Sequence, residues 1–283
     1  MRLAHLILTH ANPEQLNRLI GRLACEDADF YVHVDLKTDI APFKAAVRHG
    51  NVQFVTNRVK VNWAGYSIVQ ATLNGFEQIL ASAKAYDQVN LLSGQDYPIK
   101  STEQIHSFLA ARRGMAFMHT LSVTDEWREA IPRITEYHMP DVSFPGKHKA
   151  LGVINKLAPK RRMPVGLVPV GRSQWFTIPL HCVAYIANYM RQHPAVPRFF
   201  RMSWAPDEMI FQTILYGSPF KKDIVNDNLV YVDWSAGGAS PKVLTMADAE
   251  ALDASDKLFA RKFNPLIDTE ILDHLDTKTN LTT

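Results

Sequence analysis

The sequence predicts a single α/β domain whose central sheet is mostly parallel and flanked by helices. In the first 120 residues, apolar runs of four to six residues alternate with longer amphipathic stretches. Such alternation is typical of right-handed βαβ units, which build parallel sheets. No Gly/Ser-rich or Pro-rich linker separates two well-formed halves, so we expect one domain over residues 1–283.

The individual elements follow from hydrophobic periodicity and from helix caps and breakers. Strands are expected at 3–8, 30–35, 52–55, 88–92, 115–119, 174–178 and 229–233. Helices are expected at 13–24, 41–49, 67–84, 102–112, 181–191, 207–215 and 248–258. The first helix carries an apolar stripe beginning at Leu16, and the third carries one beginning at Val69. Gly50 should end the second helix, and Thr245 should cap the last one, with Asp248 three residues on.

The periodicity breaks between residues 122 and 166. This segment contains five prolines and a group of cations at Lys147, Lys149, Lys156, Lys160, Arg161 and Arg162. Long segments without regular structure are either solvated or functional. We expect a solvated mobile loop, and the alternative is a lid or an acceptor-contacting surface.

Composition excludes several classes of protein. The net charge of +3 demands no polyanionic partner, so no nucleic-acid ligand is expected. Two cysteines, Cys25 and Cys182, imply no disulfide framework and fit a reducing compartment. No apolar run approaches the ~18 residues of a spanning helix, and no signal peptide is evident. We expect a cytoplasmic protein, either free or in peripheral contact with the inner face of the cell membrane.

The run Ser93–Lys100 (SGQDYPIK) directly follows the expected strand at 88–92. A buried strand that stops at Gly94 and then presents Asp96 is typical of a binding crevice, because ligands of open α/β sheets sit beyond the carboxyl ends of the strands. Asp35 likewise ends the second strand, where a carboxylate either accepts hydrogen bonds from a nucleotide or caps the following turn. No glycine-rich phosphate loop of the dinucleotide or P-loop type follows any strand.

Two further clusters could carry chemistry. Asp207 and Glu208 follow Pro206 at the start of a helix, where acids either stabilise the helix end or supply a general base. Arg261 and Lys262 lie between Phe259 and Phe263. The aromatic residues would anchor this pair, which is then either a solvated edge or a grip on a diphosphate, with Lys242 as a third contact.

Metal ligands are scarce in the sequence. Asp27 and Asp29 form the one early D-x-D, but they precede a strand and so lie at the wrong end for the crevice. The eleven histidines form no zinc-binding pattern, and two cysteines cannot build a zinc site. We therefore expect a phosphate site without a metal and no other cofactor.

Taken together, the motifs resemble the core-2/I-branching β-1,6-N-acetylglucosaminyltransferase family, which includes the peptide O-xylosyltransferases. The matching strings occur in the family's order and cover most of the chain: LTH at 8–10, YVHVD at 31–35, NR at 57–58, WAGYS at 63–67, VQATLN at 69–74, LSGQDYPIK at 92–100, GRSQW at 171–175, APDE at 205–208, YVDW at 231–234 and LFARKF at 258–263. The lack of an anchor and of disulfides suggests a bacterial member.

The resemblance implies a GT-A-like (Rossmann-like) fold and inverting, metal-independent transfer of a sugar, GlcNAc first of all, from a UDP-sugar to a glycan or lipid-linked glycan. It implies a nucleotide-binding half at 1–120 and an acceptor-binding, catalytic half at 121–283. Glu208 would be the catalytic base. The expected nucleotide and diphosphate contacts are Asp35, Arg58, Trp63, Lys242, Arg261 and Lys262. The expected substrate contacts are Asp96, Trp175, Asp207 and Trp234.

Two departures from the family limit these expectations. Lys242 takes the place of a family arginine on the diphosphate, and the 122–166 segment matches poorly, so the acceptor is the least transferable feature. UDP-xylose, UDP-galactose and UDP-glucuronate are alternative donors. A module that binds nucleotide sugars or glycans without turnover is the non-enzymatic alternative.

Overall fold

The computed structural model describes the backbone of residues 1–280 and the side chains of residues 1–278. Its centre is a seven-stranded sheet in the order β10-β6-β9-β4-β1-β2-β3. The strands are β1 (Leu3–Thr9), β2 (Ala28–Val34), β3 (Val52–Phe54), β4 (Gln88–Ser93), β6 (Ala116–Phe117), β9 (Phe176–Pro179) and β10 (Ile224–Val225). All neighbours are parallel except β9, which runs antiparallel to β4 and β6. The predicted α/β class with a mostly parallel sheet is confirmed.

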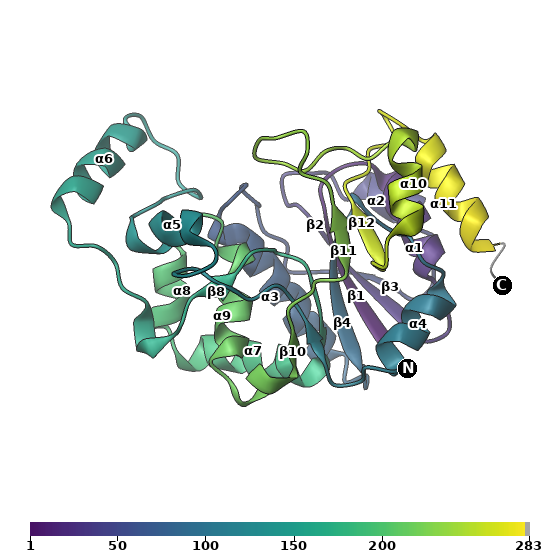
Figure 1. The fold of residues 1–283 in the computed structure, drawn as a ribbon, viewed down its shortest axis with the longest axis horizontal. Helices are drawn as coiled ribbons and strands as arrows, with labels where there is room; N and C mark the ends of the chain where they lie inside the picture. Colours follow the sequence, from purple (N-terminus) through teal and green to yellow (C-terminus); the bar gives the residue numbers. More distant parts are fainter. Residues whose placement is uncertain (281–283) are drawn as a thin grey trace.

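Helices cover both faces of this sheet (Figure 1). One face is covered by α3 (Tyr66–Ala81), α7 (Leu180–Gln192) and α9 (Ile210–Tyr216), and the other by α1 (Pro13–Leu23), α4 (Thr102–Ala110), α10 (Ala249–Ala254) and α11 (Glu270–Asn280). The shorter or outlying helices are α2 (Ala41–Ala46), α5 (Ile131–Thr135), α6 (Lys147–Leu157), α8 (Ala195–Phe200) and the 3-10 turns η1 (Arg128–Ala130), η2 (Pro164–Gly166), η3 (Pro206–Glu208), η4 (Pro219–Asp223) and η5 (Met246–Asp248). Strands covered on both faces are mostly apolar, which is why β1 (LAHLILT) has only His5 and Thr9 as polar residues, both of them buried.

Two small sheets complete the fold. β12 (Phe259–Arg261) pairs in parallel with β11 (Val230–Val232) and antiparallel with β5 (Asp96–Pro98). β7 (Leu121–Ser122) pairs with β8 (Val170–Gly171). The central sheet and the β5–β12 sheet both combine strands from residues 1–120 and from 121–283, so the two sequence halves are interleaved in one domain. Their separate binding roles stay a prediction.

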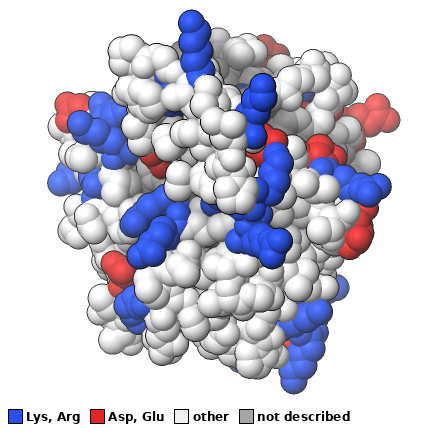
Figure 2. Space-filling view, turned by 90° about the vertical axis from the view of Figure 1, so that its left-hand side faces the viewer, with Lys and Arg blue, Asp and Glu red and all other residues white. Residues whose placement is uncertain are grey.

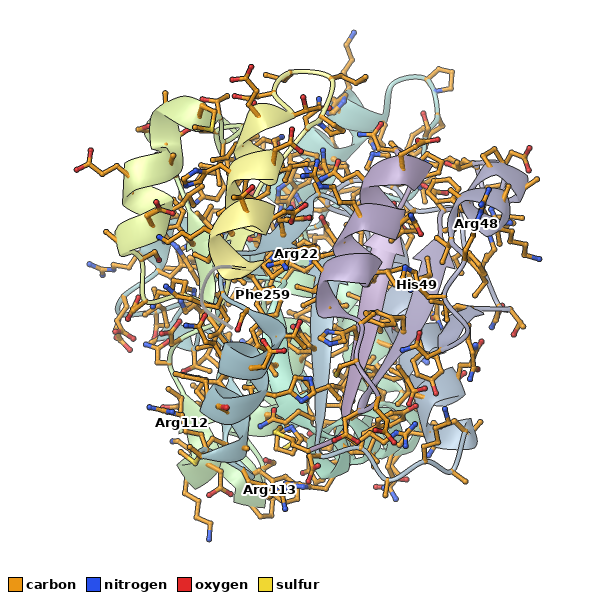
Figure 3. The ribbon with its side chains drawn as sticks, turned by 90° about the vertical axis from the view of Figure 1, so that its right-hand side faces the viewer. Arg22, Arg48, His49, Arg112, Arg113 and Phe259 are labelled. Atoms are coloured by element: carbon orange, nitrogen blue, oxygen red, sulfur yellow. The ribbon has the colours of Figure 1, made fainter. Side chains whose placement is uncertain are left out.

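The segment that carries Arg261 and Lys262 is anchored beneath helices. Figure 3 looks onto the side where α1, α4, α10 and α11 lie, with Phe259 among them. Phe259 and Phe263 are both buried, so the predicted aromatic anchoring is confirmed. At the end of α1, Arg22 forms an ion pair of 2.9 Å with Asp276 on α11, which ties the two outer helices together.

Several predicted boundaries were wrong. The 122–166 segment is not structureless, because it contains η1, α5, α6 and η2. The helix expected at 41–49 ends at Ala46, the one at 207–215 is split into η3 and α9, and the one at 248–258 ends at Ala254. The Thr245–Asp248 capping box is confirmed at η5. The sequence analysis also missed the strands β5, β7, β8, β10 and β12 and the helices α8 and α11.

A glycine controls the distance between α3 and the central sheet. A Cβ atom on Gly75 would lie 2.4 Å from Cδ1 of Leu6, a fully buried residue of β1. Such an approach is too short for any real carbon contact, so only glycine lets α3 pack this close. Gly152 on α6 differs, because a Cβ there would meet nothing within 4 Å.

We predict that Gly75→Ala lowers the free energy of unfolding by about 1–3 kcal/mol, because Leu6 must move in a packed core. Gly152→Ala is the matched control and should raise it by about 0.5–1 kcal/mol through helix propensity. Urea unfolding of both variants checks this. Equal stabilisation by the two substitutions would contradict the packing described for α3.

Candidate active site

The loops that follow β1, β2 and β4 meet at one edge of the central sheet. The Asp35 backbone N–H donates to the Thr9 carbonyl at 2.9 Å, and the Gly94 N–H donates to the Leu8 carbonyl at 2.9 Å. A Cβ atom on Gly94 would lie 2.5 Å from Thr9 Oγ1, so the strand end can turn here only with glycine. The loops predicted to line a crevice beyond the carboxyl ends of the strands therefore lie beside one another, and the crevice itself stays a prediction.

Asp96 lies at the base of this edge and is fully buried. Its Oδ2 accepts a hydrogen bond from the Ser93 N–H at 2.8 Å, and its Oδ1 accepts one from Ser93 Oγ at 3.2 Å. Burial raises the pKa of Asp96, while Arg261 and the Ser93 hydrogen bonds oppose that rise. Such a deeply buried carboxylate anchors its neighbours, and its predicted contact with substrate stays untested.

Arg261 is the cation that Asp96 anchors. Antiparallel pairing places Arg261 of β12 opposite Asp96 of β5, and their side chains form an ion pair of 3.2 Å. The other side of the guanidinium lies over the buried ring of Trp175, with Cζ 4.3 Å from the ring centroid. Trp175 therefore supports Arg261, a role that the sequence analysis did not assign to it.

Glu208 lies on the 3-10 turn η3, which packs against β8 and the residue that follows it. The Arg172 N–H donates to the Glu208 carbonyl at 3.0 Å. A Cβ atom on Gly171 would lie 2.2 Å from that carbonyl oxygen, so glycine is required for β8 to pass so close. Ala205, just before the turn, has a left-handed backbone with φ of 45°. The backbone of the turn is thus fixed while the Glu208 side chain stays one-third exposed.

Carboxylates and cation converge at this turn. Burial lowers the pKa of Arg261, and the charges of Asp96, Glu208 and Asp207 act on it in the opposite direction. Glu208 and Arg261, far apart in the chain, therefore lie within electrostatic reach of each other.

Arg133 on α5 is a site residue that the sequence analysis missed. Its Nη1 donates to Glu208 Oε2 at 2.5 Å, and its guanidinium lies 4.8 Å from the Trp127 ring centroid. Among the described residues, the second carboxylate oxygen of Glu208, Oε1, has no protein hydrogen-bond partner. Arg133 therefore fixes the orientation of the carboxylate and leaves one oxygen free. No signal in the aperiodic 122–166 segment marked this arginine.

Asp207 has the most perturbed environment of the site. Its side chain is 5% exposed, and within the described residues its Oδ1 has no hydrogen-bond partner. Burial, together with the negative charge of Glu208, raises the pKa of Asp207 to about 8. The neutral acid is therefore the form that this pocket favours below that pH.

On the side expected to hold the nucleotide, polar side chains shape the backbone. Asp35 Oδ1 accepts hydrogen bonds from the N–H groups of Lys37 at 2.9 Å and Val61 at 3.3 Å. Arg58 donates to the carbonyls of Val34, Asp35 and Thr38. The turn-capping alternative for Asp35 is thus observed. Arg58 also stabilises this loop through its hydrogen bonds. Contact of Asp35 or Arg58 with a nucleotide stays a prediction.

Trp63 connects this loop to the Glu208 turn. Its ring is 63% exposed and packs edge-on against Trp204, with centroids 5.3 Å apart. The Ala205 N–H donates to the Ala64 carbonyl at 2.9 Å, directly before η3. A cavity of about 350 Å³ adjoins the same loop; its lining residues are Val59, Tyr66, Ser67, Gln70, Asp141, Val142 and Arg201. Neither Glu208 nor Arg261 lines that cavity.

Lys242, a predicted contact of the diphosphate, is engaged in ion pairs with two carboxylates. Its Nζ forms ion pairs with Asp248 at 2.5 Å and Asp233 at 3.8 Å. The backbone nevertheless brings this region beside the predicted pair, because the Leu244 N–H donates to the Lys262 carbonyl at 2.9 Å. The remaining predicted contact, Trp234, is 56% exposed. Contacts of Lys242 and Trp234 with substrate stay predictions.

No group of three His, Cys, Asp or Glu side chains gathers as metal ligands do within the part of the chain that the structure describes. Metal independence stays a prediction. No helix among the described residues has both the length and the apolar character needed to cross a bilayer.

We predict that Asp207→Asn stabilises the protein mainly at alkaline pH. The folded pKa of Asp207 lies above its ordinary value, so its ionisation lowers stability as the pH rises toward about 8. The gain from the substitution should be at least about 1 kcal/mol larger at pH ~8 than at pH ~5, measured by urea unfolding. Asp256→Asn, at a carboxylate with 87% exposure, is the control and should show no such difference. An equal gain at both pH values would refute this assignment.

Comparison with known proteins identifies the family. A family model described as Core-2/I-Branching enzyme matches residues 3–256. Xylosyltransferase 2 from Rattus norvegicus is 25% identical, and the human protein of that name 26%, each over 300 residues that cover 98% of this chain and 33% of the relative. The chain thus spans about a third of these curated relatives.

Among solved structures, apo mouse xyloside xylosyltransferase 1 aligns over 91% of this chain and 97% of its own, with a TM-score of 0.41 and 8% identity, a likeness too weak to add to the argument. The family model, in contrast, spans most of the chain. The protein therefore belongs to the Core-2/I-branching enzyme family, as its ordered motifs predicted.

Proposed function

We propose that this protein is an inverting glycosyltransferase that moves a sugar from a UDP-sugar to a hydroxyl of a glycan, without a metal ion. The observation that carries the proposal is the match of the Core-2/I-Branching enzyme model to residues 3–256. The site geometry supports it, because the segment 171–175 contacts the Glu208 turn through Arg172 and the Arg261 guanidinium through Trp175. Family membership supports transfer chemistry, and the acceptor is a glycan or a lipid-linked glycan.

Glu208 would act as the general base. Arg133 holds Oε2, so Oε1 takes the proton from the acceptor hydroxyl as the acceptor oxygen attacks the anomeric carbon of the donor. The bond from the anomeric carbon to the UDP oxygen breaks on the opposite side. Direct displacement converts an α-linked donor into a β-glycoside. One carboxylate suffices, because UDP leaves readily and needs no acid comparable to that of a glycosidase.

The cations at β12 would stabilise the leaving group. Negative charge develops on the diphosphate as the bond breaks, and positive groups fixed beforehand lower the barrier most effectively. Arg261 is such a group, because Asp96 and Trp175 hold it in place. Lys262 would add a second contact. Lys242 could join only by leaving its ion pair with Asp248.

GlcNAc is the donor sugar that we propose first, on the family's motifs. Xylose is the second candidate, because the curated relatives reported above are named xylosyltransferases. A panel of UDP-sugars, with UDP release as the readout in the presence of glycan acceptors, separates the two. Release with none of the donors, despite tight UDP binding, would favour the binding module over the enzyme.

We predict that Glu208→Gln lowers the turnover number by about 10² to 10⁴, because the amide cannot accept the proton. UDP affinity, measured by calorimetry, should stay within a few-fold, since the base acts on the acceptor side. Glu129→Gln is the matched control, a carboxylate on the nearby turn η1 with 68% exposure. Near-normal turnover of Glu208→Gln would show that another group is the base.

We also predict that EDTA leaves the rate of transfer unchanged within about twofold, because fixed cations replace a metal at the diphosphate. Arg261→Gln, in contrast, should lower the turnover number by about 10² to 10³. Both are measured as UDP release. A strict requirement for added manganese would argue against the cationic clamp.

A further inference from the structure

The charge of this chain is distributed very unevenly along the sequence. Residues 142–206 contain none of its 28 Asp and Glu residues but ten of its 31 Lys and Arg residues. The rest of the chain therefore carries net negative charge. A segment of this length without acids carries a large positive charge within a nearly neutral protein. Its position in the structure determines which partner that charge can meet.

The helix α6 within this segment stands away from the body of the protein. Figure 1 shows it at the far end from α10 and α11, joined to the fold by two extended stretches. None of its side chains is buried. In Figure 2, which faces this end, Lys and Arg side chains spread across the middle of the surface, and most Asp and Glu lie nearer its edges.

The outward face of α6 combines cations with aliphatic side chains. Lys149, Val153 and Lys156 recur at helical spacing, with Leu157 beside them. Leu157 is 77% exposed and Val153 56%. Further large apolar side chains are exposed on either side of the helix: Val142, Phe144, Val165 and Val168. Exposed apolar groups in such number call for an explanation.

The cations of this segment divide into two groups. Lys147 donates to the carbonyls of Met139 and Val142 in the preceding loop, and Lys160 forms an ion pair of 2.9 Å with Glu136. Arg161 donates to the carbonyls of Glu136 and Met202, so it holds the end of the segment onto the body. Lys149 and Lys156, on the outward face, form no hydrogen bond or ion pair within residues 1–278. The structure thus fixes the base of α6 and leaves its outer cations available.

We propose that the outward face of α6, with Lys149, Lys156, Val153 and Leu157, docks this protein onto an anionic lipid bilayer. The lysines attract the headgroups, and the aliphatic side chains enter the interfacial layer, as in helices that lie on a membrane. A soluble polyanion would bind the cations but would leave the apolar side chains of Val153 and Leu157 exposed to water. Recognition of single-stranded nucleic acid relies on stacking aromatics, whereas the outward face of α6 is aliphatic. The surface does not include Glu208 or Arg261, so docking is separable from transfer.

The test is flotation of the full chain with vesicles of phosphatidylcholine, with or without phosphatidylglycerol. The protein should float only with the anionic vesicles, and salt should weaken its binding. Lys149→Gln with Lys156→Gln should lower the affinity about 30-fold, since each lysine near an anionic surface contributes about fivefold. Val153→Ser with Leu157→Ser should lower it about tenfold at any salt concentration.

The matched control is Lys44→Gln with Lys222→Gln, which removes the same charge from exposed sites elsewhere and should keep binding within about twofold. Equal loss in this control, or equal binding to neutral vesicles, would overturn the proposal. Binding to dextran sulfate but not to vesicles would also overturn it, if the serine substitutions left the dextran sulfate binding unchanged. UDP release onto a water-soluble acceptor should be the same in all these variants, so failure of docking is distinguishable from failure of the proposed enzyme function.

Discussion

Arg261 lies between the Asp96 carboxylate and the Trp175 ring with 16% of its side chain exposed, and the candidate site depends on that position. A buried cation is costly unless a partner compensates it, and removal of one partner of a buried ion pair typically costs about 3–5 kcal/mol. The register between β5 and β12 supplies the partner, because it places residue 261 opposite residue 96. The SGQDYP motif thus contributes to the site indirectly, because its Asp96 holds the Arg261 guanidinium in place.

The other polar residues at this edge of the sheet are likewise held by partners within the protein. Arg58 is bonded to backbone carbonyls, Asp35 to backbone N–H groups, and Lys242 to the carboxylate of a capping box. These contacts give loops of irregular shape a fixed geometry. The Glu208 turn is held in a comparable way, by the Gly171 approach and by the link from Ala64 to Ala205. Family motifs in this chain therefore mark the scaffold of the site as much as its contacts with ligand.

Much of the fold could be predicted from the sequence, because the central strands are long apolar runs and α1 and α3 carry apolar stripes. The missed strands β5 and β12 have three residues each, too few for periodicity to appear. The helix α6 was taken for a loop because prolines and cations dominate the 122–166 segment, although Ala150, Ile154 and Leu157 recur at helical spacing within it. Glu208 and Arg261 were found through ordered motifs. Arg133 was not, because it lies outside those motifs and meets Glu208 only through the tertiary fold.

The central claim is that the Glu208 carboxylate and the Arg261 guanidinium act on opposite sides of a shared site, and a crystal structure of the complex with UDP tests it most directly. The account predicts that the diphosphate oxygens lie within hydrogen-bonding distance of Arg261 and Lys262. It also predicts that Glu208 Oε1 faces the open side left for an acceptor. A diphosphate bound elsewhere, or held by a metal ion with Arg261 making no contact, would contradict it.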